Sequence, residues 1–118
     1  MLSLLLLLSA CDPPVEIRTL TDEGTVCLND NGKVQVDFPG CLSSSCDTLV
    51  SATCTVTLVD GTLEVHATAE IHSQGTTCTS DCGLIQATCD MPLVEDPETV
   101  VFSYAGQTTA LDAECQGF

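Results

Sequence analysis

The chain has 118 residues, of which 17 are acidic and only two, Arg18 and Lys33, are basic, so its formal net charge is −15 at pH 7. This charge excludes binding to nucleic acid or to anionic lipid headgroups by bulk electrostatics, because both need clusters of Lys and Arg. The length, with 44% apolar and 16% charged residues, predicts one ordered domain.

The first predicted element is an apolar leader at residues 1–10. A run this short cannot span a bilayer but is typical of a signal-peptide core. It ends in Leu8-Ser9-Ala10-Cys11, which resembles the bacterial lipoprotein box. The resemblance implies cleavage before Cys11 and attachment of lipid such as palmitate to that cysteine, followed by a tether at 11–14 and a folded domain at 15–118. No Lys or Arg precedes Cys11, so we expect the natural start of translation to lie further upstream.

The number of cysteines bears on this interpretation. If Cys11 carries lipid, eight remain, and an even number in a small exported domain predicts a disulfide framework. The eight are Cys27, Cys41, Cys46, Cys54, Cys78, Cys82, Cys89 and Cys115. One alternative places Cys11 in a disulfide of a buried N-terminal strand. Another uses the two close pairs, at 41 and 46 and at 78 and 82, as four thiolate ligands of zinc.

Apolar and polar residues alternate with a period of two through most of the remaining chain, which predicts strands rather than helices. Three turn dipeptides, Asn31-Gly32, Asp60-Gly61 and Ala105-Gly106, predict hairpins. We therefore expect an all-β, antiparallel sandwich of seven or eight strands. The predicted segments are, in chain order, 15–20, 25–29, 33–38, 50–58, 63–71, 84–89, 100–104 and 107–111.

The hairpin at Asp60-Gly61 has the most definite register. A two-residue turn places Leu58 opposite Leu63, and every second pair along the two strands is then apolar. One face is therefore predicted to be buried, while the other, with Thr, Ser, Glu and His66, meets water. The further apolar pairs are Val56 with Val65, Cys54 with Ala67, Ala52 with Ala69, and Val50 with Ile71.

The two other hairpins have patterns of the same kind. Around Asn31-Gly32, Val26 and Leu28 share a face with Val34 and Val36 only if the loop has three residues. Around Ala105-Gly106, the predicted strand places Val100, Phe102 and Tyr104 on one face. Leu111 then lies opposite Val100, and Thr109 lies opposite Phe102. Ile85, Ala87 and Cys89 share the inner face of the 84–89 strand.

These faces suggest disulfide pairings. Cys54 and Cys89 both lie on inward faces of central strands, so we expect a bridge between them. The close pairs either close locally, as Cys41 with Cys46 and Cys78 with Cys82, or link to each other, and we favour local closure. Cys27 and Cys115 then remain to join early and late strands.

Several short segments between Val34 and Leu111 form a recognisable pattern. They are Cys41-Leu42-Ser43-Ser44-Ser45-Cys46, Ala52-Thr53-Cys54, Cys78-Thr79-Ser80-Asp81-Cys82-Gly83, Ala87-Thr88-Cys89, Pro92-Leu93 and Thr109-Ala110-Leu111. Through these segments the chain resembles short, cysteine-rich bacterial lipoproteins with an immunoglobulin-like sandwich. The resemblance implies that fold and a lipid-anchored position in the cell envelope, at the inner or the outer membrane, and it implies no reaction. The chain departs from the pattern at Glu95-Asp96-Pro97-Glu98, where such proteins usually have a glycine.

Candidate chemistry is sparse. His66 and His72 lie on one predicted strand about 20 Å apart, so they cannot share a site through that strand, although each can pair with a neighbouring Glu64 or Glu70. No serine or cysteine has a recognisable activating base, and a bridged cysteine is no nucleophile. We therefore expect no enzymatic activity and no catalytic residue.

The acidic residues are a second candidate. Glu95, Asp96 and Glu98 cluster in one predicted loop and have the hard oxygen ligands that Ca²⁺ prefers, but we favour the interpretation of this segment as a solvated acidic loop that keeps the protein soluble. Asn29-Asp30-Asn31-Gly32 is similar to part of an EF-hand loop, but Cys27 and Phe38 would occupy its first and twelfth positions, so that reading fails.

The sequence therefore predicts a non-enzymatic envelope lipoprotein, held at a membrane by the lipid on Cys11, with an unidentified protein partner and no nucleic acid. The alternatives are a calcium-stabilised adhesion domain and a protease-inhibitor-like domain that presents a disulfide-braced loop, Leu42 to Ser45. By resemblance, Asp12 after the lipidated cysteine favours retention at the inner membrane.

Overall fold

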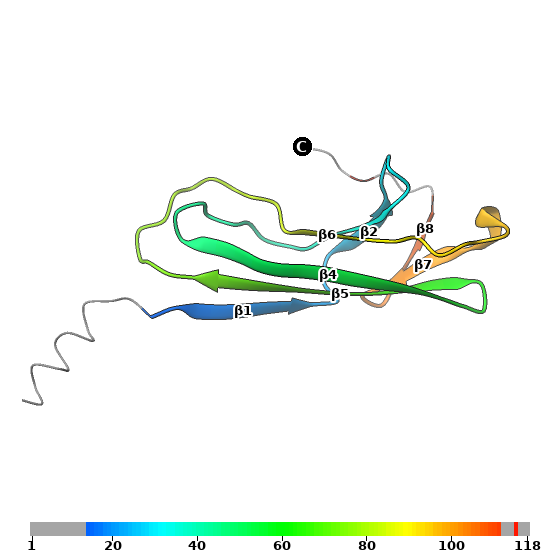
Figure 1. Cartoon of the computed structure of the whole chain (residues 1–118), viewed down its shortest axis with the longest axis horizontal. Helices are drawn as coiled ribbons and strands as arrows, with labels where there is room; N and C mark the ends of the chain where they lie inside the picture. Colours follow the sequence, from blue (N-terminus) through cyan, green and yellow to red (C-terminus); the bar gives the residue numbers. More distant parts are fainter. Residues whose placement is uncertain (1–13, 112–114, 116–118) are drawn as a thin grey trace, which may run out of the picture.

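Two β-sheets make up most of the chain in the computed structural model, which describes residues 14–111 and 115 (Figure 1). The expectation of a mostly β protein is confirmed. Among these residues there is one short 3-10 turn, η1 (Pro97–Thr99), and no helix long and apolar enough to cross a membrane. The strands are β1 (Glu16–Thr21), β2 (Thr25–Leu28), β3 (Val34–Asp37), β4 (Asp47–Val59), β5 (Thr62–Ser73), β6 (Gln86–Cys89), β7 (Val101–Tyr104) and β8 (Gln107–Ala110).

The larger sheet is built around β5. Along one edge β5 pairs with β4, and along the other it pairs first with β7, from Thr62 to Glu64, and then with β1, from Thr68 to Ser73. β8 pairs with β7. The β5–β7 pair is parallel, so the expectation of an entirely antiparallel fold is wrong at this place. Turn signals in a sequence predict only the pairing of consecutive strands. β5 and β7 are not consecutive, because β6 of the smaller sheet lies between them in the chain.

The smaller sheet has the order β2-β3-β6, with both pairs antiparallel. Val26 lies opposite Val36 and Leu28 opposite Val34, which is the register of a three-residue loop. The apolar residues 26 and 28 therefore share a face with their partners, as the sequence predicts for that loop length. Val34 and Val36 are completely buried because this face packs toward the larger sheet.

The register of the long hairpin is confirmed over most of its length and wrong at one end. Pairs from Leu58↔Leu63 to Ser51↔Glu70 follow the prediction, but Ile71 lies opposite Leu49, and Val50 is the extra residue of a β-bulge. The bulge turns Leu49 toward the core and leaves Val50 51% exposed. It arises because Asp47 is held opposite Ser73, which leaves one more residue on β4 than on β5 in this stretch.

Four disulfides connect these elements. Cys54–Cys89 joins β4 to β6 across the two sheets, and Cys27–Cys115 joins β2 to a late residue, which are the two pairings expected there. Local closure is wrong for both close pairs. In place of Cys41–Cys46 and Cys78–Cys82, the bridges are Cys41–Cys82 and Cys46–Cys78.

The reason for this exchange is an isolated antiparallel bridge between Leu42 and Gly83. Leu42 N–H donates to the Gly83 carbonyl at 2.9 Å, and Gly83 N–H donates to the Leu42 carbonyl at 2.8 Å. The two loops therefore run side by side, and each cysteine meets a partner in the other loop, with Cα atoms 4.7 Å and 5.6 Å apart. The zinc alternative is wrong because these four sulfurs bond to one another.

Candidate functional site

The most elaborate surface feature is the cross-linked loop pair, residues 41–47 and 77–83, which we call the clasp. It lies at the end of the β4–β5 hairpin opposite the Asp60-Gly61 turn, and β1 begins at the same end (Figure 1). The first strand pair there, Glu16↔Ser73, places the start of β1 directly beside the clasp.

A closed turn shapes the first loop of the clasp. Ser43 N–H donates to the Asp47 carboxylate at 2.7 Å, and Asp47 N–H donates back to the Ser43 carbonyl at 2.8 Å. The other oxygen of the Asp47 carboxylate accepts the Ser73 hydroxyl at 2.6 Å. One carboxylate therefore fixes the loop to the last residue of β5.

Hydroxyl groups join the two loops between the disulfides. Thr79 N–H donates to Ser45 Oγ at 2.9 Å, and the hydroxyls of Ser43 and Thr79 lie 3.0 Å apart. Ser44 N–H lies 3.3 Å from both oxygens of Asp81, whose carboxylate also accepts the Thr79 hydroxyl. The clasp is thus a rigid, hydroxyl-rich and acidic surface, and its polar groups bond mainly to one another.

The electrostatics of the clasp favour ionised carboxylates. Hydrogen bonds from the Ser73 hydroxyl and the Ser43 N–H, with the nearby charge of Arg18, lower the pKa of Asp47. Hydrogen bonds from Thr79 and Ser44 lower the pKa of Asp81. Carboxylates with lowered pKa values are weak bases, so neither Asp47 nor Asp81 activates the neighbouring hydroxyls as nucleophiles.

The protease-inhibitor alternative requires that the loop from Leu42 to Ser45 present its residues to a protease. In the structure, Leu42 is half-buried, packs against the core, and has both its main-chain groups bonded to Gly83. The main-chain N–H groups of Ser43 and Ser44 bond to carboxylates. The loop therefore exposes serine hydroxyls and not an extended, unpaired backbone. The inhibitor reading stays a prediction without structural support.

A second candidate is a shallow hollow between β5 and β7, whose lining includes His66, Asp22, Ser103 and Tyr104. Asp22 has a positive φ of 49° at the end of β1, which lets its carboxylate accept Ala67 N–H at 2.9 Å and lie 3.3 Å from His66 Nδ1. His66 therefore pairs with Asp22 and not with Glu64. No hydrogen bond joins Ser103 to His66 in the part of the chain described, so these residues form no relay for proton transfer.

Tyr104 forms the floor of this region. Its side chain is buried, and its hydroxyl donates to the Glu23 carbonyl at 2.7 Å. Burial, with the nearby negative charges of Asp22 and Glu23, raises its pKa to about 12. The phenol is therefore neutral at physiological pH and serves as a structural donor.

The second histidine lies apart from the first. His72 Nε2 lies 2.8 Å from the Glu70 carboxylate on the outer face of β5, the neighbour pairing that the sequence allowed. Because His66 and His72 contact different carboxylates, the structure does not bring them into one site.

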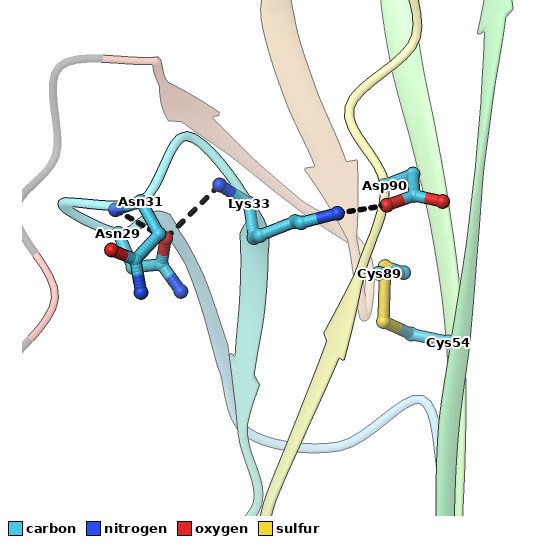
Figure 2. A network of polar contacts seen from close by, with 6 residues as sticks. All are labelled: Asn29, Asn31, Lys33, Cys54, Cys89 and Asp90. Atoms are coloured by element: carbon cyan, nitrogen blue, oxygen red, sulfur yellow. Dashed lines mark hydrogen bonds and ion pairs between the residues drawn. A yellow bond between two sulfur atoms is a disulfide. The ribbon is translucent and has the colours of Figure 1, made fainter.

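The calcium candidates Glu95 and Asp96 are exposed residues just before η1, and the side chain of Glu98 lies outside the described part of the structure. Within residues 14–111 and 115, no three His, Cys, Asp or Glu side chains are grouped so that they could hold a metal ion. In the loop that begins at Asn29, the side-chain oxygen Oδ1 of Asn29 accepts hydrogen bonds from the main-chain N–H groups of Asn31 and Lys33, at 3.0 Å each (Figure 2).

Figure 2 also shows a contact that the sequence did not indicate. Lys33 is the residue just before β3, and its ammonium contacts the carboxylate of Asp90, next to the Cys54–Cys89 disulfide. This hydrogen bond and ion pair lower the pKa of Asp90. Asp22, Asp47 and Asp81 were also missed as site residues. A signal for Asp47 exists in the Ser-x-x-x-Asp spacing from residue 43, which suits a closed turn.

The predicted leader 1–10, Cys11 with its expected lipid, and most of the predicted tether lie outside the described residues. No protein-family model, curated protein or solved structure matches this chain. The candidate sites are therefore defined by their geometry alone.

Proposed function

We propose that this protein is a non-enzymatic lipoprotein of the bacterial cell envelope, anchored through lipid on Cys11, whose β domain serves as a protein-interaction module. The observation that carries the proposal is the use of the cysteines. The four disulfides take up all eight cysteines downstream of Cys11. The ninth lies at the end of an apolar leader in a lipobox-like sequence, and disulfides of this density are typical of exported domains.

An anchored chain would have a defined orientation. Four residue steps separate Cys11 from Val15, a reach of at most about 14 Å, and Val15 lines a shallow hollow with Ser44 and Ser45 of the clasp. The clasp would therefore face the bilayer. The Asp60-Gly61 turn and the acidic segment with Glu95 and Asp96 lie at the opposite end (Figure 1) and would face away from it.

Mass spectrometry of the protein extracted from membranes tests the anchor. We expect an acylated N-terminal Cys11 and four disulfides. We also expect the Cys11→Ser protein to be absent from the membrane fraction but to keep the melting temperature of the wild type, because the anchor contributes nothing to the core. An unmodified Cys11 in exported protein would overturn the proposal.

The orientation has its own test. The lipidated protein is placed in nanodiscs with spin-labelled headgroups, and the broadening of amide NMR signals is measured. Signals of Ser44 and Thr79 should broaden much more than those of Asp60 and Gly61. Equal broadening at both ends would contradict a clasp that faces the membrane.

We further infer an immunoglobulin-like arrangement of the two sheets. The support is the inter-sheet disulfide Cys54–Cys89 and the division of one edge of β5 between an early strand, β1, and a late strand, β7. An experimental structure in which the sheets align within about 30° would agree with this inference, and orthogonal sheets would contradict it.

A further inference from the structure

The outer edge of β1 is open. In the part of the chain that the structure describes, Glu16–Thr21 pairs with β5 alone, and no hydrogen bond from a turn or loop reaches it from the other side. Figure 1 shows β1 along the margin of the molecule, with β5 on one side and no described segment on the other. The corresponding edge of β4 differs, because β6 lies beside it and is linked to it by Cys54–Cys89. Another strand can therefore reach β1.

The direction of the free main-chain groups on β1 follows from its pairing with β5. Asp22 N–H donates to the Ala67 carbonyl at 2.9 Å, and these residues form the next pair after the end of β1. Hydrogen-bonded pairs alternate along an antiparallel ladder, so the even-numbered residues of β1 direct their main-chain groups to β5. Ile17, Thr19 and, just before the strand, Val15 therefore direct their N–H and C=O groups away from the sheet.

The side chains of β1 are exposed on both faces of the sheet. On the outer face, Ile17 is 65% exposed, and Val15, two residues earlier, is 51% exposed. Arg18 lies opposite the buried Ile71, so Arg18 and Glu16 are on the inner face, yet both are exposed. The smaller sheet therefore does not cover this edge, and there is room beside it for another strand.

Arg18 is a cation without an ionic partner in its own chain. The chain has 17 acidic residues and two basic ones, and the other basic residue, Lys33, pairs with Asp90. Among the described residues Arg18 forms no ion pair. Its charge acts on Asp47 only at longer range, and that carboxylate already accepts two hydrogen bonds. An exposed guanidinium at an open strand edge is thus available to a carboxylate from outside.

One register pairs β1 with a second copy of itself so that opposite charges meet. When a two-fold axis passes through Ile17, Glu16 of each copy lies opposite Arg18 of the other. Ile17 then exchanges main-chain hydrogen bonds with its own counterpart, and Thr19 does so with Val15, which are the residues with outward main-chain groups. Glu16 and Arg18 fall in the non-hydrogen-bonded pairs, whose side chains approach each other most closely.

Shifted registers bring like charges together. A two-fold axis at Arg18 places the two guanidiniums opposite each other, and an axis at Glu16 does the same with two carboxylates. An axis at Thr19 places Glu16 opposite Asp22 of the other copy. The order Glu-Ile-Arg at residues 16–18 thus selects the register centred on Ile17.

We propose that two copies of this chain associate through their β1 edges, antiparallel and centred on Ile17, to form one continuous sheet. A second copy is the occupant because it supplies Arg18 with the carboxylate that its own chain does not provide, and Glu16 with a cation. The pairing also covers the exposed Ile17. The ion pairs select the partner and the register, while main-chain hydrogen bonds and apolar contact hold the two strands together.

The pair is extended. Because β1 begins at the clasp (Figure 1), the two clasps lie near the axis and the two Asp60-Gly61 turns lie at the far ends. The pairing rests on the folded domain and not on the proposed anchor. In an anchored pair both long axes would lie along the bilayer, so the end-on orientation proposed above is that of an unpaired copy.

Sedimentation equilibrium of the chain from residue 11 onward, with Cys11→Ser and with its disulfides intact, tests the pairing. We expect a concentration-dependent dimer. Arg18→Glu and Glu16→Arg each place like charges opposite each other across the axis, so either one should weaken dimerisation about tenfold or more. Both substitutions in one chain leave the net charge unchanged and restore opposite charges across the axis, so the dimer should return.

An equal mixture of the two single variants tests the register most directly. In a mixed pair, residues 16 and 18 are both acidic in one copy and both basic in the other, so every facing pair has opposite charges. The mixture should therefore form a one-to-one dimer at concentrations at which each variant alone is monomeric.

The main-chain bonds have their own variant. Thr19→Pro removes an outward N–H group that its own chain does not use, so it should keep the fold and abolish the dimer. Circular dichroism of each variant, diluted to monomer, checks that the fold is kept. A chain that stays monomeric at millimolar concentration overturns the proposal. A dimer that survives Thr19→Pro or either single charge variant also overturns it, as does one that neither the double variant nor the mixture restores.

Discussion

The Tyr104 hydroxyl donates a 2.7 Å hydrogen bond to the main-chain carbonyl of Glu23, 81 residues earlier in the chain. This bond attaches β7 to the turn between β1 and β2, where the chain passes from the larger sheet to the smaller one. The same turn holds Asp22 in a positive-φ conformation beside His66. One buried phenol therefore stabilises both the sheet crossing and the hollow above it.

Titration of Tyr104 should show its burial directly. It is the single tyrosine, and the chain has no tryptophan, so the ultraviolet absorbance of phenolate reports this side chain alone. We expect a midpoint about two units above the ordinary value of 10, because the folded-state pKa is about 12. A midpoint near 10 in the folded protein would contradict the burial described here.

Alkaline stability should change in the same window. A group whose folded pKa is raised contributes its full stabilisation below its unfolded pKa, near 10, and loses it as the pH rises through its folded pKa, near 12. The free energy of unfolding, measured with denaturant, should therefore fall from pH 10 upward. Tyr104→Phe is the control, since it lacks the titrating group and should not show this fall.

Gly24 should tolerate no side chain. It has a φ of +92°, and a Cβ there would lie 1.9 Å from the Asp37 carbonyl oxygen. We expect Gly24→Ala to destabilise the protein by more than about 2 kcal/mol, since backbone strain and the steric clash add. Gly32→Ala is the matched control, because Gly32 has a φ of +74° but nothing within 4 Å of the added Cβ. It should cost about 1 kcal/mol. Equal costs in urea denaturation would contradict the close approach.

The pairing within the clasp can be read from free thiols. Cys41→Ser with Cys82→Ser removes one bridge and should leave no free thiol in the clasp, because Cys46–Cys78 persists. Cys41→Ser with Cys46→Ser takes one partner from each bridge and should leave two free thiols, at Cys78 and Cys82. Local closure would reverse the two counts. The first variant should lose about 2 to 4 kcal/mol of stability.

Acid should loosen the clasp and the Lys33–Asp90 contact. The pKa values of Asp47, Asp81 and Asp90 are lowered by their hydrogen bonds. Lowered folded-state pKa values stabilise the protein above the unfolded value of 3.8, and this stabilisation is lost as the pH falls through the folded values. Stability measured from pH 6 downward should therefore decline below about pH 4.

Asp47→Asn should show a smaller part of this acid-induced decline than wild type, because it removes one titrating carboxylate that two hydrogen bonds stabilise. Asp60→Asn, at the exposed turn of the opposite end, serves as the control and should follow the wild-type curve. Identical curves for all three proteins would show that the Asp47 contacts contribute nothing to acid stability.

Local patterning determined much of the fold. In the β4–β5 hairpin, a two-residue turn and a period of two suffice to place Leu58 opposite Leu63 and Cys54 opposite Ala67. The same alternation identifies Cys54 and Cys89 as inward-facing residues of two sheets, and hence their disulfide. The hairpin register depends on residues that are close in sequence. The inward direction of the two cysteines follows because the apolar face of each strand is the one that becomes buried.

Tertiary structure alone decided the features that depend on how distant segments meet. The parallel β5–β7 pair, the bulge at Val50 and the exchange of partners in the clasp each follow from contacts between segments far apart in the chain. A turn dipeptide specifies only its own hairpin, and cysteine spacing leaves connectivity open. The amino-acid order thus determines which faces are buried and how neighbouring strands pair, while the packing of the two sheets and two loops selects among the arrangements that remain.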